Sequence, residues 1–304
     1  MFEGFELTTI DTGETTIRVR HGGSGPPLLL LHGAPQTHVM WHLVAPRLAE
    51  EFTVVATDLR GYGESGKPET TPDHEPYSKR AMARDQVAVM RSLGFERFSI
   101  AGHDRGGRVA YRLALDHPER VEKLAVLDII PTGEAFRRTD FRFAMGYWHW
   151  FFLAQPFDLP ERVIGADPEA YFGRRRDAPF TPEARAEYAR HWQDPAFIHG
   201  ICEDYRAGAT FDFQLDEADR GKRKIACPVL ALWGSRGALE SWYDVLAIWR
   251  DWADDVRGRA IESGHYLAEE AQDETYAELR AFFTSQAAGG GGRAQPRSGR
   301  PRPA

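Results

Sequence analysis

The segment that decides the fold reads Ser99-Ile100-Ala101-Gly102-His103-Asp104-Arg105-Gly106-Gly107-Arg108. An apolar run leads to one reactive side chain, Asp104, and small residues follow it where a helix can begin. The pattern predicts a tight strand-to-helix turn, because Gly102 and Gly106 allow a backbone reversal in which larger side chains would collide. A nucleophile at the tip of such a turn faces substrate. The plainer interpretation is an ordinary turn in which Asp104 caps the helix.

Apolar runs and helix-like segments alternate on both sides of this turn. Strands buried on both faces are predicted where polar alternation is missing, at Leu28–Leu31, Phe52–Ala56, Phe98–Ala101, Leu124–Leu127 and Pro228–Gly234. A hairpin is predicted at Phe5–Ile10 and Thr15–His21, and a short last strand at Arg259–Ile261. Helices are predicted at Val39–Glu50, Tyr77–Leu93, Arg105–His117, Ser241–Ala253 and Asp273–Thr284. This order predicts an α/β fold, a mostly parallel sheet flanked by helices.

The alternation stops after Asp128. From about Pro131 to Lys222 there are no strand-like runs, but many aromatic residues and helix-compatible stretches. We therefore predict a helical cap, residues 131–222, inserted between the two parts of a core at 1–130 and 223–286. The tail at 287–304 is rich in Gly, Arg and Pro, and it is predicted to be disordered because it cannot bury a core.

Composition narrows the class of protein. The 304-residue chain has a formal net charge of −7, which argues against nucleic acid as its main partner. Cys202 and Cys227 lie in unrelated contexts, which favours two reduced thiols. Neither a leader pattern nor a membrane-spanning run is present, so we expect a soluble, cytoplasmic protein with no membrane partner. The histidines are scattered without ligand spacing, and we expect neither a metal nor another cofactor.

A carboxylate at such a turn can displace a leaving group from carbon and form an ester with the enzyme. Water must then hydrolyse that ester, and His265, after the last predicted strand, is the expected general base. A structural histidine is the alternative. Asp128, at the end of the strand that follows the turn, is the expected partner that orients His265. Glu240 and Asp244 are weaker options.

Backbone and side-chain groups next to Asp104 complete the predicted site. The backbone N–H groups of Arg105 and Ala34 are expected to form an oxyanion hole for the ester. The side chains of Arg105 and Arg108 lie three residues apart on the first turn of the helix, where they can share a face. Two guanidinium groups there suit a small carboxylate substrate. The alternative is that these arginines are solvent-exposed or form salt bridges with acids of the cap.

Several motifs together give the chain a family resemblance. They are His32-Gly33-Ala34-Pro35-Gln36, His103 to Arg108, Leu127-Asp128-Ile129, Tyr147 to Trp150 with Phe152 to Pro156, Glu203 to Gly208, and Glu262 to His265. The chain resembles the haloacetate (fluoroacetate) dehalogenases of the α/β-hydrolase fold, and more loosely the epoxide hydrolases and haloalkane dehalogenases. The resemblance runs from about residue 5 to residue 284.

The resemblance implies a role for each matching residue. Asp104 would be the nucleophile, Arg105 and Arg108 would bind the carboxylate of a haloacid, and Asp128 with His265 would drive ester hydrolysis. It also implies that His149 and Trp150 donate hydrogen bonds to the departing halide, and that the protein is a homodimer.

Three departures from the family pattern concern substrate preference. Thr210 stands where the resemblance places a third halide donor, a tyrosine, and Ala34 stands where it places Phe. A tryptophan expected between Phe172 and Arg185 is missing, although Trp192 offers a replacement. Since fluoride is the hardest halide to expel, we expect chloroacetate, bromoacetate or longer 2-halo acids to react faster than fluoroacetate.

Two other functions use the same residues differently. An epoxide hydrolase would keep Asp104 and His265 and would activate the epoxide oxygen with cap tyrosines, for which Tyr147, Tyr171, Tyr188 and Tyr205 are available. The two arginines have no obvious role with a neutral epoxide. A non-catalytic ligand-binding protein of the same fold would need no nucleophile, acid and base together.

Overall fold

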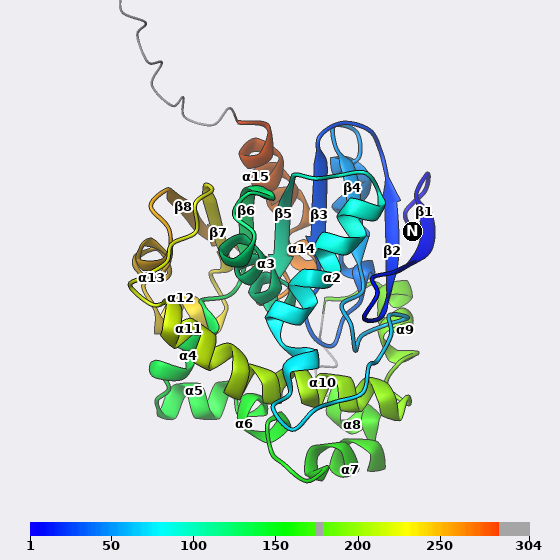
Figure 1. The fold of residues 1–304 in the computed structure, drawn as a ribbon, viewed down its shortest axis with the longest axis vertical. Helices are drawn as coiled ribbons and strands as arrows, with labels where there is room; N and C mark the ends of the chain where they lie inside the picture. The colour runs from blue at the N-terminus through cyan, green and yellow to red at the C-terminus, as the bar shows by residue number, and fades with distance from the viewer. Residues whose placement is uncertain (174–178, 286–304) are drawn as a thin grey trace, which may run out of the picture.

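A computed structural model describes residues 1–173 and 179–285 (Figure 1). Within these residues, eight strands form one sheet in the order β1-β2-β4-β3-β5-β6-β7-β8. The strands are β1 (Glu6–Asp11), β2 (Thr16–Gly22), β3 (Pro27–Leu31), β4 (Thr53–Thr57), β5 (Phe98–His103), β6 (Val121–Leu127), β7 (Val229–Gly234) and β8 (Val256–Ile261). This is the sheet that the alternating runs predict.

The pairing of the strands follows from their sequence patterns. β1 and β2 form the antiparallel hairpin, and β2 pairs antiparallel with β4. All later pairs are parallel, and the apolar run Leu28–Leu31 in β3 is completely buried between β4 and β5. Because parallel strands all end at the same edge, the residues that follow β5, β6 and β8 are brought together there.

Helices flank the sheet, with α2 and α3 on the face toward the viewer in Figure 1. The helices of this part are α1 (Ala45–Leu48), α2 (Lys79–Ser92), α3 (Asp104–Asp116), α12 (Ala238–Trp242), α13 (Val245–Trp252), α14 (Leu267–Glu270) and α15 (Gln272–Thr284), with 3-10 turns η1 (His38–Trp41) and η2 (Glu75–Tyr77).

Two predicted helices are divided in the structure. The predicted helix Val39–Glu50 is a 3-10 turn followed by the short α1, which has Pro46 in its first turn. A proline disfavours helical backbone in the residue before it, so a continuous helix cannot pass this point easily. The predicted helix Ser241–Ala253 is α12 and α13, because Asp244 accepts a hydrogen bond from the backbone N–H of Ala247 and starts a new helix.

The segment between β6 and β7 is helical. It contains α4 (Thr132–Arg137), α5 (Phe141–Gly146), α6 (His149–Leu153), α7 (Leu159–Ala166), α8 (Pro168–Phe172), α9 (Pro182–Ala189), α10 (Pro195–Ala207), the π-helical turn η3 (Gly208–Asp212) and α11 (Phe213–Asp219). We call these helices the insertion. Its described residues between Pro131 and Lys222 form no strand. Figure 1 shows α5, α6, α7 and α8 as a layer below the sheet.

Some predictions concern parts of the chain outside this description. The predicted disordered tail, 287–304, lies outside the described residues, as do residues 174–178 within the segment that lacks the expected tryptophan. The division into a core and a separate cap stays a prediction. No helix in the described part of the chain is long and apolar enough to cross a membrane.

Candidate active site

Asp104 lies at a strained turn between β5 and α3. Its φ angle is +46°, a conformation that costs energy for a residue with a side chain. Both predicted glycines are required by space: a Cβ at Gly102 would lie 2.4 Å from the carbonyl oxygen of Gly106, and one at Gly106 would lie 2.5 Å from that of His32. His103, not Asp104, occupies the N-cap position of α3, so the helix-cap interpretation of Asp104 is wrong. The carboxylate instead lines a cavity.

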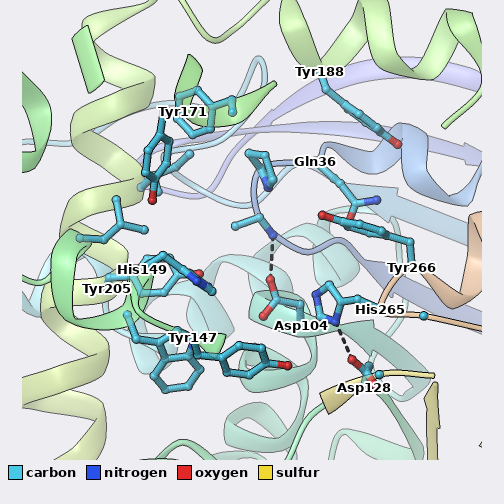
Figure 2. Close-up of a pocket in the computed structure, with 18 of the residues that line it drawn as sticks. Gln36, Asp104, Asp128, Tyr147, His149, Tyr171, Tyr188, Tyr205, His265 and Tyr266 are labelled. Atoms are coloured by element: carbon cyan, nitrogen blue, oxygen red, sulfur yellow. Dashed lines mark hydrogen bonds and ion pairs between the residues drawn. The ribbon is translucent and has the colours of Figure 1, made fainter. Parts of the chain in front are cut away.

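The residues after β6 and β8 meet beside Asp104 (Figure 2). Asp128 directly follows β6, and its Oδ2 lies 2.6 Å from Nδ1 of His265. Its Oδ1 accepts the backbone N–H of Gly234 at 3.0 Å, which leaves the carboxylate buried and fixed. Of the weaker candidates, Glu240 accepts from the indole N–H of Trp233, and Asp244 caps α13. The geometry therefore favours Asp128 as the group that orients His265.

One of the two expected oxyanion donors contacts the nucleophile directly. The backbone N–H of Ala34 donates to Oδ2 of Asp104 at 3.1 Å. The loop that carries Ala34 is supported by His32, whose Nε2 accepts the backbone N–H of Leu59 at 2.9 Å. The Arg105 N–H begins helix α3 next to Asp104. Burial opposes ionisation of Asp104, but His265, His103 and the two arginines outweigh it and lower its pKa to about 2. Asp104 is thus an anion at neutral pH, as a nucleophile must be.

The two arginines of the first turn of α3 have different surroundings. Arg105 is turned to Asp204 of α10: its Nε donates to Oδ2 at 2.8 Å and its Nη2 to Oδ1 at 2.7 Å. The alternative interpretation, a salt bridge to an acid of the insertion, is therefore correct for this side chain, which is not among the residues that line the cavity. Its Nη1 is buried without a hydrogen-bond partner among the described residues.

Arg108 does line the cavity. Its Nη1 donates to the carbonyl oxygen of Ile130 at 3.0 Å and to the hydroxyl of Thr132 at 3.2 Å, and its guanidinium lies 4.5 Å from the ring centre of Trp150. Within the described residues no carboxylate is in ion-pair distance, although the side chain is 3% exposed. Asp104 raises the pKa of Arg108, but burial and the charge of Arg105 outweigh it, so an anionic ligand beside Arg108 would add a favourable charge.

The cavity has a volume of about 280 Å³ and lies between the carboxyl ends of the strands and the insertion. Its lining is rich in Phe, Tyr and Trp and includes the charged side chains Asp104, Arg108 and Asp128. The lining residues are Ala34, Pro35, Gln36, Asp104, Arg108, Asp128, Tyr147, His149, Trp150, Leu153, Tyr171, Phe172, Phe180, Arg185, Tyr188, Trp192, Ile201, Tyr205, Arg236, Gly237, Ala238, Gly264, His265 and Tyr266. Trp192, which the sequence offered as a replacement for the missing tryptophan, is among them.

Of the three expected halide donors, two line the cavity and one does not. His149 and Trp150, at the start of α6, both face it. Thr210 is exposed outside it, and its hydroxyl donates to the carbonyl oxygen of Arg206 at 2.7 Å. The placement of a donor at Thr210 is therefore wrong. The reason is that α10 presents Tyr205 to the cavity, whereas Thr210 lies farther along, in the π-helical turn.

Sequence reasoning named Tyr205 as a cap tyrosine for an epoxide but missed it as a candidate halide donor. Its ring centre lies 5.9 Å from that of His149 and 6.1 Å from that of Trp150, nearly perpendicular to each. The signal was present, since Tyr205 is part of the motif from Glu203 to Gly208, but only the helix direction decides which of its residues faces the cavity. Burial and the nearby Asp104 hold the pKa of Tyr205 well above its usual value, so its hydroxyl is protonated.

Two of the tyrosines that the sequence offered for an epoxide, Tyr188 and Tyr147, also line the cavity. Gln36 and Tyr188 both contact a buried carboxyl group, Glu269. Burial and the nearby charges of Asp128 and Asp104 raise the pKa of Tyr147. No sequence motif marks Glu269 as part of the site. Among residues 1–173 and 179–285, no group of His, Cys, Asp and Glu side chains could hold a metal ion, and both cysteines are free and buried.

Comparison with known proteins places the chain in a family. Residues 26–272 match the model of the alpha/beta hydrolase fold. The chain is 50% identical over 296 residues to a fluoroacetate dehalogenase of Burkholderia sp, covering 95% of this chain and 97% of that protein. It is 36% identical over 261 residues to a soluble epoxide hydrolase of Corynebacterium sp., covering 82% of this chain and 86% of that protein.

A solved structure has the same fold as this chain. An alpha/beta hydrolase from Nostoc sp PCC 7120 superimposes with a TM-score of 0.92 at 56% identity, covering 93% of this chain and 99% of the other. The fold and the site thus define a hydrolase, and the chain belongs to the α/β-hydrolase fold family. Within that family its resemblance to the haloacetate dehalogenases is confirmed.

Proposed function

We propose that this hydrolase removes halide from small 2-halo carboxylic acids, haloacetates among them. The observation that carries the proposal is the pairing of the anionic nucleophile Asp104 with Arg108, a buried cation that lacks a carboxylate partner among the described residues and lines the same cavity. The 50% identity to a fluoroacetate dehalogenase supports the same substrate class.

The reaction has two steps, in each of which the atoms balance. A carboxylate oxygen of Asp104 attacks C2 of the acid, the carbon–halogen bond breaks, and the halide leaves with the bonding electrons. His265 then takes a proton from water, whose oxygen attacks the Asp104 carbonyl carbon while backbone N–H groups of Ala34 and Arg105 stabilise the oxyanion. On collapse the bond between the Asp104 carbonyl carbon and the substrate oxygen breaks, and that oxygen takes the proton from His265 to give a 2-hydroxy acid. The carboxyl group of Asp104 then loses its proton to solvent and is ready for the next substrate. Asp128 keeps His265 in the correct tautomer.

The remaining roles follow from chemistry and position. Arg108 binds the substrate carboxylate, and Arg105, held by Asp204 outside the cavity lining, adds positive charge beside it. His149, Trp150 and Tyr205 supply three N–H or O–H donors to the halide. Because Tyr205 provides a third donor, the argument for slow fluoroacetate turnover that rested on Thr210 is lost, and we include fluoroacetate among the substrates.

The size of the cavity supports longer 2-halo acids as well. An apolar cavity of about 150 Å³ is enough to hold benzene, and this one measures about 280 Å³. A haloacetate leaves much of that space empty. Since the carboxylate, the halide and the reacting carbon are all held at one end, only a substituent on C2 can fill the rest.

Isotope labelling tests the proposal. The enzyme, in molar excess over bromoacetate, is incubated in heavy-oxygen water so that each active site turns over at most once. The peptide containing Asp104 is then examined by mass spectrometry. We expect heavy oxygen in Asp104, because water attacks its carbonyl carbon and not the substrate. Bromide release without label in Asp104 would exclude the ester route, and Asp104→Asn is the inactive control.

Epoxide hydrolysis is the second candidate. It is supported by Tyr147 and Tyr205, two protonated hydroxyl-bearing side chains in the cavity with Asp104, and by the 36% identity to a soluble epoxide hydrolase. Parallel assays with styrene oxide and chloroacetate distinguish the two. We expect chloroacetate to be the better substrate, because a neutral epoxide leaves Arg108 without a counter-charge.

We also propose a homodimer that works in the cytoplasm. Exposed apolar side chains gather on one part of the insertion, which we call the apolar patch: Phe141, Met145, Trp148, Phe151, Phe157, Leu159 and Val163. They lie on α5, α6 and α7 and in the links between these helices, which Figure 1 draws in the lower part of the molecule. Large exposed apolar side chains on neighbouring helices are typical of a protein–protein interface.

A further inference from the structure

Two adjacent carboxyl groups at the end of α14, Glu269 and Glu270, reach two different parts of the site. α14 begins at Leu267, directly after the segment that carries His265. Glu270 contacts that segment, and Glu269 contacts the loop after β3 that carries Ala34. The two groups therefore connect the general base and the oxyanion hole to one short helix.

Glu270 holds the backbone on both sides of His265. Its Oε2 accepts the N–H of Gly264 at 2.5 Å, and its Oε1 accepts the N–H of Tyr266 at 2.9 Å. The approach is close, because a Cβ at position 264 would lie 2.9 Å from Oε1 of Glu270 and would displace its carboxylate. Nε2 of His103 donates to the carbonyl oxygen of His265 at 2.7 Å. The peptide groups around the base are thus fixed, two of them by bonds to a charged acceptor, which are the stronger kind.

Glu269 holds the oxyanion loop through Gln36. Its Oε2 accepts from Nε2 of Gln36 at 2.5 Å, and its Oε1 accepts from the hydroxyl of Tyr188 at 2.9 Å. Gln36 lies two residues after Ala34, whose N–H contacts Asp104. Burial raises the pKa of Glu269 to about 8, so this carboxyl group is mostly neutral at pH 7. The partners of Glu269 are a side-chain amide and a hydroxyl, each of which can also accept from an amide N–H. The partners of Glu270 are two backbone N–H groups, which can only donate. An amide is therefore a fair substitute for Glu269 but not for Glu270.

Both contacts matter for only one of the two chemical steps. Halide displacement needs the Asp104 carboxylate, the carboxylate-binding arginine and the halide donors. Ester hydrolysis needs His265 to take a proton from water, and it needs the backbone N–H groups to stabilise the oxyanion. A group that aligns His265 therefore acts on the second step, and one that aligns Ala34 acts mainly on that step, although the Ala34 N–H also contacts Asp104.

We propose that Glu270 and Glu269 are positioning residues for ester hydrolysis, the former by orienting His265 and the latter by orienting the oxyanion loop. This inference rests on the proposed two-step function. It adds two residues to the reaction that touch neither substrate nor nucleophile.

Pre-steady-state halide release tests the inference with one substitution at two neighbouring positions. Bromoacetate is mixed at pH 7 with each of four variants: Glu270→Gln, Glu269→Gln, Glu269→Leu and the surface control Asp273→Asn. For Glu270→Gln and Glu269→Leu we expect a burst of about one bromide per active site, followed by a steady state slowed about tenfold or more, as loss of a hydrogen bond of this kind predicts. Glu269→Gln and Asp273→Asn should behave like the wild type.

The burst separates positioning from general damage. A variant that is merely misfolded loses burst and steady state together, and its melting temperature shows this. If Glu270→Gln shows no burst, or if its burst rate and steady-state rate fall by the same factor, the role of Glu270 is overturned. If Glu269→Gln and Glu269→Leu lose equal fractions of the steady-state rate, the role of Glu269 is overturned. If the wild type releases no bromide at all, it is the proposed function that fails. If the wild type labels Asp104 and the variants show no burst, only this inference fails.

Discussion

Arg105 and Arg108 show how the surroundings of a side chain decide its role. The two lie on the same turn of α3 and are both buried, yet Arg105 is neutralised by Asp204 while Arg108 donates only to an uncharged carbonyl oxygen and a hydroxyl. Burial and the neighbouring Arg105 charge lower the pKa of Arg108, whereas Asp204 outweighs burial and raises that of Arg105. Arg108 is consequently the cation with charge to offer a ligand.

Removing that charge should weaken substrate binding. We expect Arg108→Leu to raise KM for chloroacetate about 100-fold, because a charge-assisted hydrogen bond of about 1.5–3 kcal/mol is lost together with the buried counter-charge. Arg108→Lys keeps the charge without the planar fork and should fall in between. Steady-state kinetics of both variants provide the measurement. A KM for Arg108→Leu within threefold of the wild type, roughly the error of such comparisons, would contradict the assignment.

Tyr205 should matter most for the worst leaving group. Tyr205→Phe keeps the ring that packs against His149 and Trp150 and removes only the hydroxyl. We expect kcat for fluoroacetate to fall about 10- to 100-fold and kcat for bromoacetate much less, because fluoride accepts the strongest hydrogen bonds as it leaves. Fluoride- and bromide-electrode assays on the same preparation give the ratio. Thr210→Val, outside the cavity, is the matched control and should change neither rate.

Glu269 should make stability depend on pH. Its pKa is raised from 4.5 to about 8 by burial. The folded state thus binds more protons than the unfolded state between these values, and the stability that the neutral carboxyl allows is present below pH 4.5 and is lost as pH rises toward 8. We expect the wild type to lose stability relative to Glu269→Gln between pH 5.5 and 9. Urea unfolding gives the free energy of unfolding of both proteins at pH 5.5 and pH 9. If the difference between the two proteins is the same at both pH values, the prediction is wrong.

At the scale of elements, the turn from β5 into α3 leaves no room for a side chain at its glycines. Gly106 → Ala would place a Cβ 2.5 Å from the His32 carbonyl oxygen, so either the helix or the oxyanion loop must move. We expect a loss of about 2–4 kcal/mol in the free energy of unfolding, within the range of severe core substitutions. Gly165→Ala in α7 is the control, since a Cβ there meets nothing within 4 Å and Ala is the better helix former. Urea titrations of the two variants give the comparison, and equal stabilities would contradict the packing argument.

Elements with a strong sequence pattern were predicted well. The strands that lack polar alternation, such as Leu28–Leu31 and Leu124–Leu127, lie in the centre of the sheet where both faces are covered. Predictions failed where a local interaction divides a helix, as Asp244 does, or where a turn of a helix decides which side chain faces the cavity. Tyr205 and Thr210 are within five residues of each other, and only their direction on α10 and η3 separates them.

At the scale of the whole molecule, the apolar patch should hold two copies together. We expect the wild type to be a dimer in solution and the double variant Phe141→Glu, Met145→Lys to be a monomer, because charges at 78% and 64% exposed positions would have to be buried without partners at the interface. Light scattering after size exclusion gives the mass. Arg91→Glu, on the surface of α2, is the control that should leave the mass unchanged. A monomeric wild type would contradict the proposed dimer.

The sequence by itself determined the sheet, the insertion and the chemical types in the site. Runs of apolar residues, glycines at a forced turn, and the chain order of Asp104, Asp128 and His265 are local features, and local sterics and burial are enough to interpret them. Tertiary structure alone decided which groups meet. Asp204 neutralises Arg105, Tyr205 replaces Thr210, and Glu269 reaches Gln36 across 233 positions of sequence. Such contacts depend on how α10 and α14 pack against the ends of the strands, and no spacing along one chain encodes that geometry.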